Sequence, residues 1–253
     1  MDPYREAPRS HPAVPVAIVV GFAMIALAIF FTGNEKENIA QIPSNIPEGD
    51  VLETTVRPPD QTDFIKGNPN APILMIEYSD YDCPFCKQYH ETLNQIMNEY
   101  GITGRVAWVY RQFPLKQLHP NAPKISEAAL CVGELGGSAA FWKFTDSIFA
   151  GRELQEPTNM ITLPDVAAEA GVDKAAYQSC VSSGKMKEKV EASVEEALAL
   201  GAQGTPYTVL VVGNEQAVIN GAQSYDVVKS IIDNLISQLD GQPTTIETAT
   251  TTP

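Results

Sequence analysis

The spacing of hydrophobic and polar residues changes between extended and helical along the chain. An apolar run of strand length occupies residues 73–78, directly after a turn at residues 67–70. Helical spacing follows, and Gly101 is expected to end that helix. The apolar positions of the helix are Phe85, Tyr89, Leu93, Ile96, Met97 and Tyr100. A second apolar run at residues 105–110 completes a strand–helix–strand unit, in which the two strands are expected to be parallel.

The pattern changes again beyond residue 120. Residues 121–200 are rich in alanine and amphipathic repeats, with glycines that end them, and they predict three to five helices and no strand. Two further strands at residues 207–212 and 217–219 are joined by a Gly-Asn turn, which is typical of a hairpin. An amphipathic helix closes the domain. The predicted fold is therefore an α/β sheet interrupted by a helical insertion.

The N-terminal region contains a long apolar segment, because residues 14–31 carry no charged side chain. A helix of this length spans roughly 27 Å, close to the hydrocarbon thickness of a bilayer. Arg5 and Arg9 precede it, which predicts a transmembrane signal-anchor with residues 1–13 in the cytoplasm. The alternative is a cleaved signal peptide, since residues 26–28 have the small-x-small form. Both interpretations place the remaining chain outside the cytoplasm, where disulfides persist.

Two polar segments flank the predicted domain at residues 62–240. Residues 32–61 contain prolines and little periodicity, which favours a linker between the membrane and the domain. Residues 241–253 are rich in threonine and are expected to form a disordered tail. The chain has a formal net charge of -14 and a pI near 4.6. Such acidity disfavours nucleic acid as a partner.

The motif Cys-Pro-Phe-Cys at residues 83–86 carries the chemistry that the pattern places between strand and helix. Pro84 suits the first turn of a helix, so Cys83 is expected at the helix N-terminus, where unpaired N–H groups stabilise a thiolate. Cys86 follows one turn later on the same face. We expect Cys83 to be the exposed nucleophile and Cys86 to be the shielded cysteine that resolves a mixed disulfide.

Two other interpretations of the motif remain. It supplies half of a tetrahedral zinc site, but Cys131, Cys180 and the three histidines do not complete a ligand set by spacing, so no metal is expected. A purely structural Cys83–Cys86 disulfide is the second alternative.

The dipeptide Thr205-Pro206, which precedes the strand at residue 207, can adopt the cis form. Taken alone, this proline is equally a residue at the start of a strand.

In this order, the motifs resemble those of DsbA-like thiol:disulfide oxidoreductases in the thioredoxin superfamily, in the thioredoxin_4/BdbD-like branch. The matching segments are KGNPNAP at 66–72, EYSDYDCPFC at 77–86, RQFPL at 111–115, HP at 119–120, FW at 141–142 and GTP at 204–206. The resemblance covers about residues 63–240. It implies a thioredoxin fold with an inserted α-helical domain, and this agrees with the helical pattern of residues 121–200.

The resemblance also implies roles for residues outside the Cys-Pro-Phe-Cys motif. Thr205 and Pro206 would form a cis-proline loop against the cysteine pair, and the Thr205 backbone would bind an extended substrate. Glu77 would point inward and assist proton transfer to the buried cysteine; the alternative is a partly exposed carboxylate at the strand end. Cys131 and Cys180 would form a structural disulfide, the alternative being two buried free cysteines.

Phe85 departs from the pattern of many DsbA proteins, which carry histidine before the second cysteine. Without that imidazole, the Cys83 thiolate is expected to be less stabilised and the protein less oxidising. His90, four residues after Cys86, is interpreted as a surface residue. His119 is interpreted as a turn-packing or capping group.

The function that the resemblance implies is a membrane-tethered oxidase, monomeric, with the Cys83–Cys86 disulfide as its redox centre and no other cofactor. Its substrates would be exported unfolded proteins, and a membrane reoxidase of the DsbB or VKOR type would restore the disulfide. One alternative is an isomerase or reductase with the same exchange chemistry. Another is a non-enzymatic thiol module for metal or heme maturation.

Overall fold

The structure, a computed structural model, describes residues 55–241. The predicted membrane helix at residues 14–31, most of the predicted linker and the tail beyond residue 241 lie outside the described residues. Within residues 55–241, every helix is too short or too polar to cross a bilayer.

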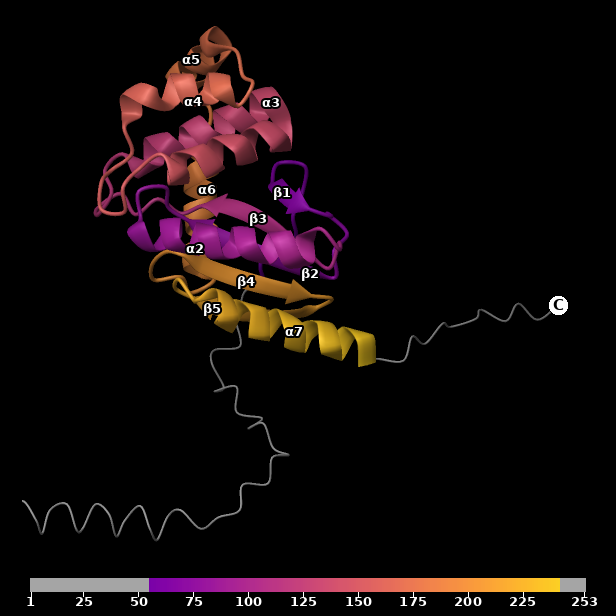
Figure 1. The fold of residues 1–253 in the computed structure, drawn as a ribbon. Helices are drawn as coiled ribbons and strands as arrows, with labels where there is room; N and C mark the ends of the chain where they lie inside the picture. The colour runs from indigo at the N-terminus through magenta and orange to yellow at the C-terminus, as the bar shows by residue number, and fades with distance from the viewer. Residues whose placement is uncertain (1–54, 242–253) are drawn as a thin grey trace, which may run out of the picture. The chain divides into compact units, whose positions relative to one another are not determined.

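A five-stranded mixed sheet forms the centre of the domain, in the order β1-β3-β2-β4-β5 (Figure 1). Its strands are β1 (Phe64–Gly67), β2 (Ile73–Ser79), β3 (Val106–Gln112), β4 (Tyr207–Val212) and β5 (Glu215–Asn220). The parallel pairing of β2 with β3 and the β4–β5 hairpin confirm the predictions from spacing. β1 was not predicted; it pairs antiparallel with β3 and has four mostly half-buried residues.

Helices cover both faces of the sheet. The helices α2 (Pro84–Ile96) and α7 (Tyr225–Gly241) pack on one face, and α6 (Lys187–Ala199) packs on the other. Since side chains alternate along a strand, Met75 and Glu77 of β2 point toward α2, while Ile76 and Tyr78 point toward α6. The α2 face therefore receives the polar residue Glu77 together with the cysteine pair.

The insertion between β3 and β4 is entirely helical, as the sequence predicts. It comprises α3 (Ala122–Ala150), the short 3-10 helix η2 (Met160–Thr162), α4 (Leu163–Glu169), α5 (Lys174–Ser183) and α6. The first three α-helices pack together, and Figure 1 shows them grouped above α2. A disulfide joins Cys131 of α3 to Cys180 of α5, in agreement with the pairing that the resemblance implies.

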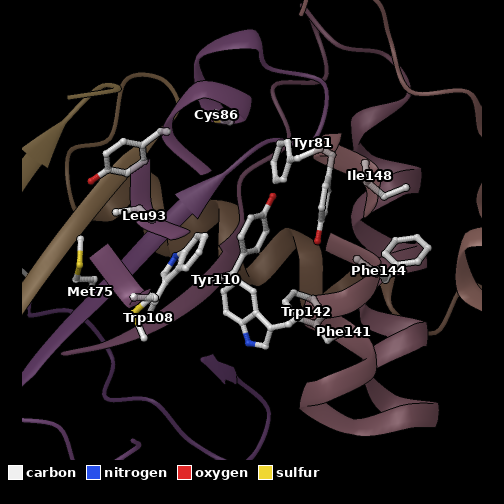
Figure 2. Packing of buried hydrophobic residues seen from close by; sticks show 14 of the residues in the cluster. Met75, Tyr81, Cys86, Leu93, Trp108, Tyr110, Phe141, Trp142, Phe144 and Ile148 are labelled. Carbon is white, nitrogen blue, oxygen red and sulfur yellow. The ribbon is translucent and has the colours of Figure 1, made fainter. Parts of the chain in front are cut away.

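Aromatic side chains connect the insertion to the sheet. The ring centroid of Tyr110 in β3 lies 5.9 Å from that of Phe141 in α3, and the centroid of Trp108 lies 4.6 Å from that of Trp142 in α3. These rings are buried in one continuous core (Figure 2). Fully burying a large apolar side chain contributes about 1.5–3 kcal/mol, so this junction is a main determinant of how α3 sits on the sheet.

His90 is not a surface residue, and that prediction was wrong. Its side chain is buried, its Nε2 lies 2.7 Å from Asp146 Oδ1, and its ring lies 4.6 Å from that of Phe149. Both partners belong to α3, which docks across this side of α2. Periodicity within α2 alone could not reveal that a later helix covers this position.

Candidate active site

The motif at residues 83–86 lies at the junction of β2 with α2, where the sequence predicts it. Cys83 is the N-cap of α2 with an extended backbone (φ -71°, ψ 126°), and Pro84 occupies the first turn. The amide of Lys87 closes the first helical hydrogen bond on Cys83 O at 3.2 Å. The free N–H groups of the first turn are thus directed at the Cys83 side chain, which favours an anion there.

Cys83 is not exposed as predicted, since only 3% of its surface is accessible. The Thr205-Pro206 turn, whose peptide bond is cis, lies against it, and Cys83 Sγ is 3.6 Å from Thr205 O. The pKa of Cys83 is nonetheless lowered to about 6, chiefly because the Cys86 thiol donates to it. Burial opposes the shift, while the Thr205 side chain and the amides of Phe85 and Cys86 support it.

Cys86 has the opposite environment. It is fully buried, and the amide of Asp80 donates to its sulfur at 3.4 Å. Burial raises the pKa of Cys86 well above its ordinary value, and the neighbouring Cys83 thiolate raises it further. One sulfur is therefore stabilised as a thiolate and the other as a thiol, which is the asymmetry that directed disulfide exchange requires.

Glu77 points inward, so it is not an exposed carboxylate at the strand end. It is fully buried, and Trp108 Nε1 donates to its Oε2 at 3.0 Å. Burial raises the pKa of Glu77 to about 7, and the charge of Cys83 adds to the shift. At neutral pH this carboxyl can therefore either donate or accept a proton close to the cysteine pair.

Phe85, between the two cysteines, has 60% of its surface exposed. An aromatic ring left in water next to a reactive thiolate offers an apolar contact to a passing polypeptide. Thr205 presents its backbone on the other side of Cys83.

Two aspartates that the sequence analysis did not single out hold loops around the site. Asp80 accepts hydrogen bonds from the amides of Asp82 (2.8 Å) and Leu115 (2.7 Å), and its Oδ2 lies 2.9 Å from His119 Nδ1. Asp82 accepts one from the amide of Thr158 at 2.8 Å. The Asp-x-Asp spacing directly before the motif was the available signal, since short acidic side chains commonly bind loop amides.

Arg152 is the other residue that sequence reasoning missed. Its Nη2 donates to Cys83 O at 2.6 Å, and its Nη1 donates to the carbonyls of Glu153, Leu154 and Glu156. The guanidinium therefore ties the loop after α3 to the start of α2. Sixty-nine positions separate Arg152 from Cys83, and no local pattern marks the contact.

No metal centre can be described here, because residues 55–241 contain no group of three His, Cys, Asp or Glu side chains placed to hold an ion.

Solved structures share this fold. BdbD from Bacillus subtilis in its oxidised form has a TM-score of 0.62 and 20% identity, covering 73% of this chain and 98% of that one. The alpha-DsbA1 protein of Wolbachia pipientis has a TM-score of 0.61 and 22% identity, covering 71% and 94%. At these identities, the likeness shows that this chain has the same fold as DsbA and BdbD.

Relatives that are similar in sequence are named as Na(+)/H(+) antiporters. A Na(+)/H(+) antiporter NhaA 1 from Mycolicibacterium gilvum is 31% identical over 155 residues, or 60% of this chain. An antiporter NhaA 3 from Salinispora tropica is 27% identical over 144 residues. The matches span about a quarter of the length of these curated relatives, 24% and 21% respectively.

A family model described as thioredoxin matches residues 59–234, well over half of the chain, and the chain therefore belongs to that thioredoxin family.

Proposed function

We propose that this protein is a membrane-tethered, extracytoplasmic thiol:disulfide oxidoreductase that forms disulfides in exported proteins. The observation that carries the proposal is the difference between the two thiols of one motif. The pKa of Cys83 is lowered to about 6, whereas that of the buried Cys86 is raised well above its ordinary value. A thiolate stabilised in the reduced protein makes the corresponding disulfide a better oxidant.

The exchange proceeds in two balanced steps. A substrate thiolate attacks Cys83 Sγ, the Cys83–Cys86 bond breaks, and its electron pair goes to the Cys86 sulfur, which takes up a proton. A second substrate thiolate then attacks the substrate sulfur of the mixed disulfide, forms the substrate disulfide and releases the Cys83 thiolate. The substrate loses two electrons and the cysteine pair gains them. The low pKa of Cys83 favours its departure in the second step.

The surroundings of Cys83 support an extended, unfolded substrate. The backbone of Thr205 runs beside Cys83, where a polypeptide can add as a strand, and the exposed Phe85 supplies an apolar contact. No pocket that selects one side chain is required for such binding, so a broad range of exported proteins is proposed as substrates.

The sequence supports the cellular setting that we propose. The apolar segment at residues 14–31 is proposed as an uncleaved anchor, with the thioredoxin domain outside the cytoplasm. A membrane reoxidase of the DsbB or VKOR type would return the pair to the disulfide, without a further cofactor, and the protein would act as a monomer. Antiport is not proposed, because the match covers only 24% of the first antiporter relative.

The test combines oxidative refolding with trapping. Full-length protein in its oxidised form is expected to restore activity to a reduced, unfolded secretory ribonuclease, and the Cys83→Ala variant is not. Cys86→Ala, expressed in the native host, is expected to accumulate mixed disulfides between Cys83 and exported proteins. The double variant Cys131→Ala/Cys180→Ala is the matched control and retains refolding activity.

Two outcomes favour the alternatives. If the protein reactivates only scrambled ribonuclease, in which wrong disulfides are already present, isomerase or reductase activity replaces the proposal. If Cys86→Ala traps no exported protein and the wild-type pair binds a metal or heme in place of exchanging disulfides, a maturation module is the better description.

A further inference from the structure

Arg152 is a buried cation that has no carboxylate partner in the part of the chain that the structure describes. Only 6% of its surface is exposed, and every acceptor that its guanidinium reaches there is a neutral backbone carbonyl. Its Nε is buried and lacks a hydrogen-bond partner among the same residues. A guanidinium stays charged in proteins, and a buried charge is costly unless an opposite charge lies nearby. An anion close to Arg152 is therefore expected.

Arg111, the other buried arginine of residues 55–241, shows the usual arrangement. Its guanidinium lies 3.0 Å from a carboxylate oxygen of Asp63 and 2.9 Å from one of Glu196, so two carboxylates offset its charge. Glu196 belongs to α6, on the face of the sheet opposite α2. Arg152 is buried almost as deeply without such a pair. The anion that offsets its charge is therefore not a directly bonded carboxylate.

The residue that the Arg152 guanidinium contacts is the one that carries the redox thiolate. Arg152 Nη2 donates to Cys83 O at 2.6 Å, so the charge lies against the start of α2. Burial lowers the pKa of Arg152, and negative charge on Asp82, Cys83, Cys86 and Asp80 opposes this shift. The two aspartates are permanent anions at neutral pH, whereas Cys83 is negative only when the pair is reduced. The electrostatic energy of Arg152 therefore depends on the redox state of the pair.

Two other cationic side chains lie near the site, but each is bonded elsewhere. Lys87 of α2 donates through its Nζ to Phe149 O in α3. His119 Nδ1 lies 2.9 Å from Asp80 Oδ2. Among the residues that the structure describes, only Arg152 places its charged group on an atom of Cys83.

The guanidinium is held in a fixed position by the loop that follows α3. Its Nη1 donates to three carbonyls of that loop at 3.1 to 3.3 Å. The loop is itself tied to the motif, because the amide of Thr158 donates to Asp82 Oδ1 at 2.8 Å. A charge whose position is fixed in advance stabilises a forming anion without having to reorganise.

We propose that Arg152 is a positioning residue of the redox centre, which holds the Cys83 carbonyl and supplies a fixed positive charge that favours the reduced pair. The inference deepens the proposed function and rests on it. When a substrate dithiol reduces the Cys83–Cys86 disulfide, its two electrons and one of its two protons go to the pair, and the other proton goes to water. Cys86 becomes a thiol, and one negative charge remains on Cys83, near the guanidinium. Because this attraction exists only after reduction, it makes the disulfide a stronger oxidant.

The first measurement is the equilibrium of the full-length protein with glutathione buffers at pH 8, where Cys83 in the reduced protein is a thiolate because its pKa is about 6. A thiol-alkylating mass label measures the reduced fraction. Arg152→Gln keeps a donor for Cys83 O but removes the charge, and it should lower the equilibrium constant for reduction about tenfold, or about 30 mV. Arg152→Lys keeps the charge and should stay within about threefold of wild type.

The second measurement is the rate at which iodoacetamide alkylates Cys83 in the reduced protein between pH 4 and pH 9. The wild-type rate should rise with an inflection near the pKa of Cys83, about 6. In Arg152→Gln the inflection should lie about one pH unit higher, which is the same tenfold loss of thiolate stabilisation.

Two further variants separate the charge from the anchoring of the loop. Asp82→Asn keeps a side-chain oxygen for the amide of Thr158 and removes a negative charge next to Cys83, so it should raise the equilibrium constant. Arg105→Gln is the matched control for net charge, because Arg105 Nε is also buried without a partner among the described residues. Arg105 O accepts from the amide of Ile73 at the start of β2, whereas Cys83 follows the end of β2. This variant should stay within about twofold of wild type.

Thermal melting checks that each variant is folded, and a loss of stability that is equal in both redox states leaves the equilibrium constant unchanged. The proposal is overturned if Arg152→Gln matches Arg105→Gln in equilibrium constant and inflection, or if Arg152→Lys falls as far as Arg152→Gln. If Arg152→Gln does not fold, an equilibrium constant that is unchanged or lower in Asp82→Asn overturns it instead. Glutathione reduces the pair whether or not the protein oxidises polypeptides, so this proposal and the proposed function can fail independently.

Discussion

The chain holds two cysteine pairs in opposite surroundings. Cys83 and Cys86 lie three residues apart, next to a helix N-terminus, a buried carboxyl and a cis-proline turn. Cys131 and Cys180 lie 49 residues apart and pack against a cluster of apolar side chains. The members of that cluster are Leu130, Met186, Val190, Phe64 and Val181.

The difference shows that the surroundings, not the residue type, decide what a cysteine pair does. Apolar neighbours offer no donor to a thiolate, so a bond placed there is inert and acts on the unfolded state by closing a long loop. Polar neighbours stabilise one thiolate and shield the other thiol, and the bond becomes exchangeable.

Removing each pair in turn should separate exchange from stability. Cys83→Ala is expected to abolish disulfide exchange, whereas Cys131→Ala/Cys180→Ala should keep exchange within about twofold. The double variant should lose about 4 kcal/mol of unfolding free energy, the chain-entropy value for a 49-residue loop. Urea unfolding measures this loss. A double variant as stable as wild type would contradict the structural role of that bond.

Glu77 should give the redox site a pH dependence that the structural disulfide lacks. Between its ordinary pKa of 4.5 and its folded pKa of about 7, the folded protein holds a proton that the unfolded chain has released. The free energy of unfolding should therefore fall by up to about 3 kcal/mol as the pH rises from 4.5 to 7.

Glu77→Gln should remove this decline. Urea unfolding of the oxidised protein, in which neither active-site thiol titrates and only burial raises the pKa of Glu77, should show a flatter profile for the variant between pH 5 and 8. Parallel profiles for the two proteins would mean that Glu77 titrates near its ordinary pKa in the fold.

The reduced protein should respond to pH in the opposite sense through Cys83. Its pKa falls from 9.0 to about 6, so between these values the unfolded chain holds a proton that the folded protein lacks. The thiolate should contribute about 1 kcal/mol to unfolding free energy at pH 7, and this should be lost as the pH falls through 6. Subtracting the profile of reduced Cys83→Ala from that of reduced wild type isolates the contribution. A difference that does not change between pH 5 and 8 would refute it.

Phe85 should tune the redox pair by the smallest amount. Phe85→His adds an imidazole donor near the Cys83 thiolate and should raise the redox potential by tens of millivolts, equivalent to about 1 kcal/mol. Equilibration with glutathione buffers measures the potential, and Phe85→Leu serves as the apolar control. Equal potentials for the histidine and leucine variants would show that this position does not set the oxidising strength.

Much of the architecture was predictable, because strand and helix periods are local properties. The order of elements between residues 73 and 241 and the all-helical insertion both follow from spacing. β1 was not predicted, because its four residues show no alternation of buried and exposed side chains. The catalytic candidates Cys83 and Cys86 were found through a motif, and so was the turn at Thr205, 122 positions from Cys83.

The parts that were missed depend on contacts between distant segments. Arg152 reaches Cys83 O from the loop after α3, and Trp108 of β3 reaches Glu77 on the neighbouring strand β2. His90 was misassigned because α3 covers it, and the exposure of Cys83 was overestimated because the Thr205 turn covers it. Neither contact can be predicted from the spacing of hydrophobic residues in α2, the helix that contains His90 and is capped by Cys83.

The aromatic junction has one practical consequence. The chain contains two tryptophans, Trp108 and Trp142, and their rings lie 4.6 Å apart with Lys66 Nζ over both. Trp108 also donates to Glu77, the carboxyl beside the cysteine pair. All tryptophan emission of this protein therefore originates at one place, where the sheet, the insertion and the redox site meet. The molecule therefore carries its own optical probe of this place, and we expect tryptophan emission to change when the cysteine pair is oxidised or reduced.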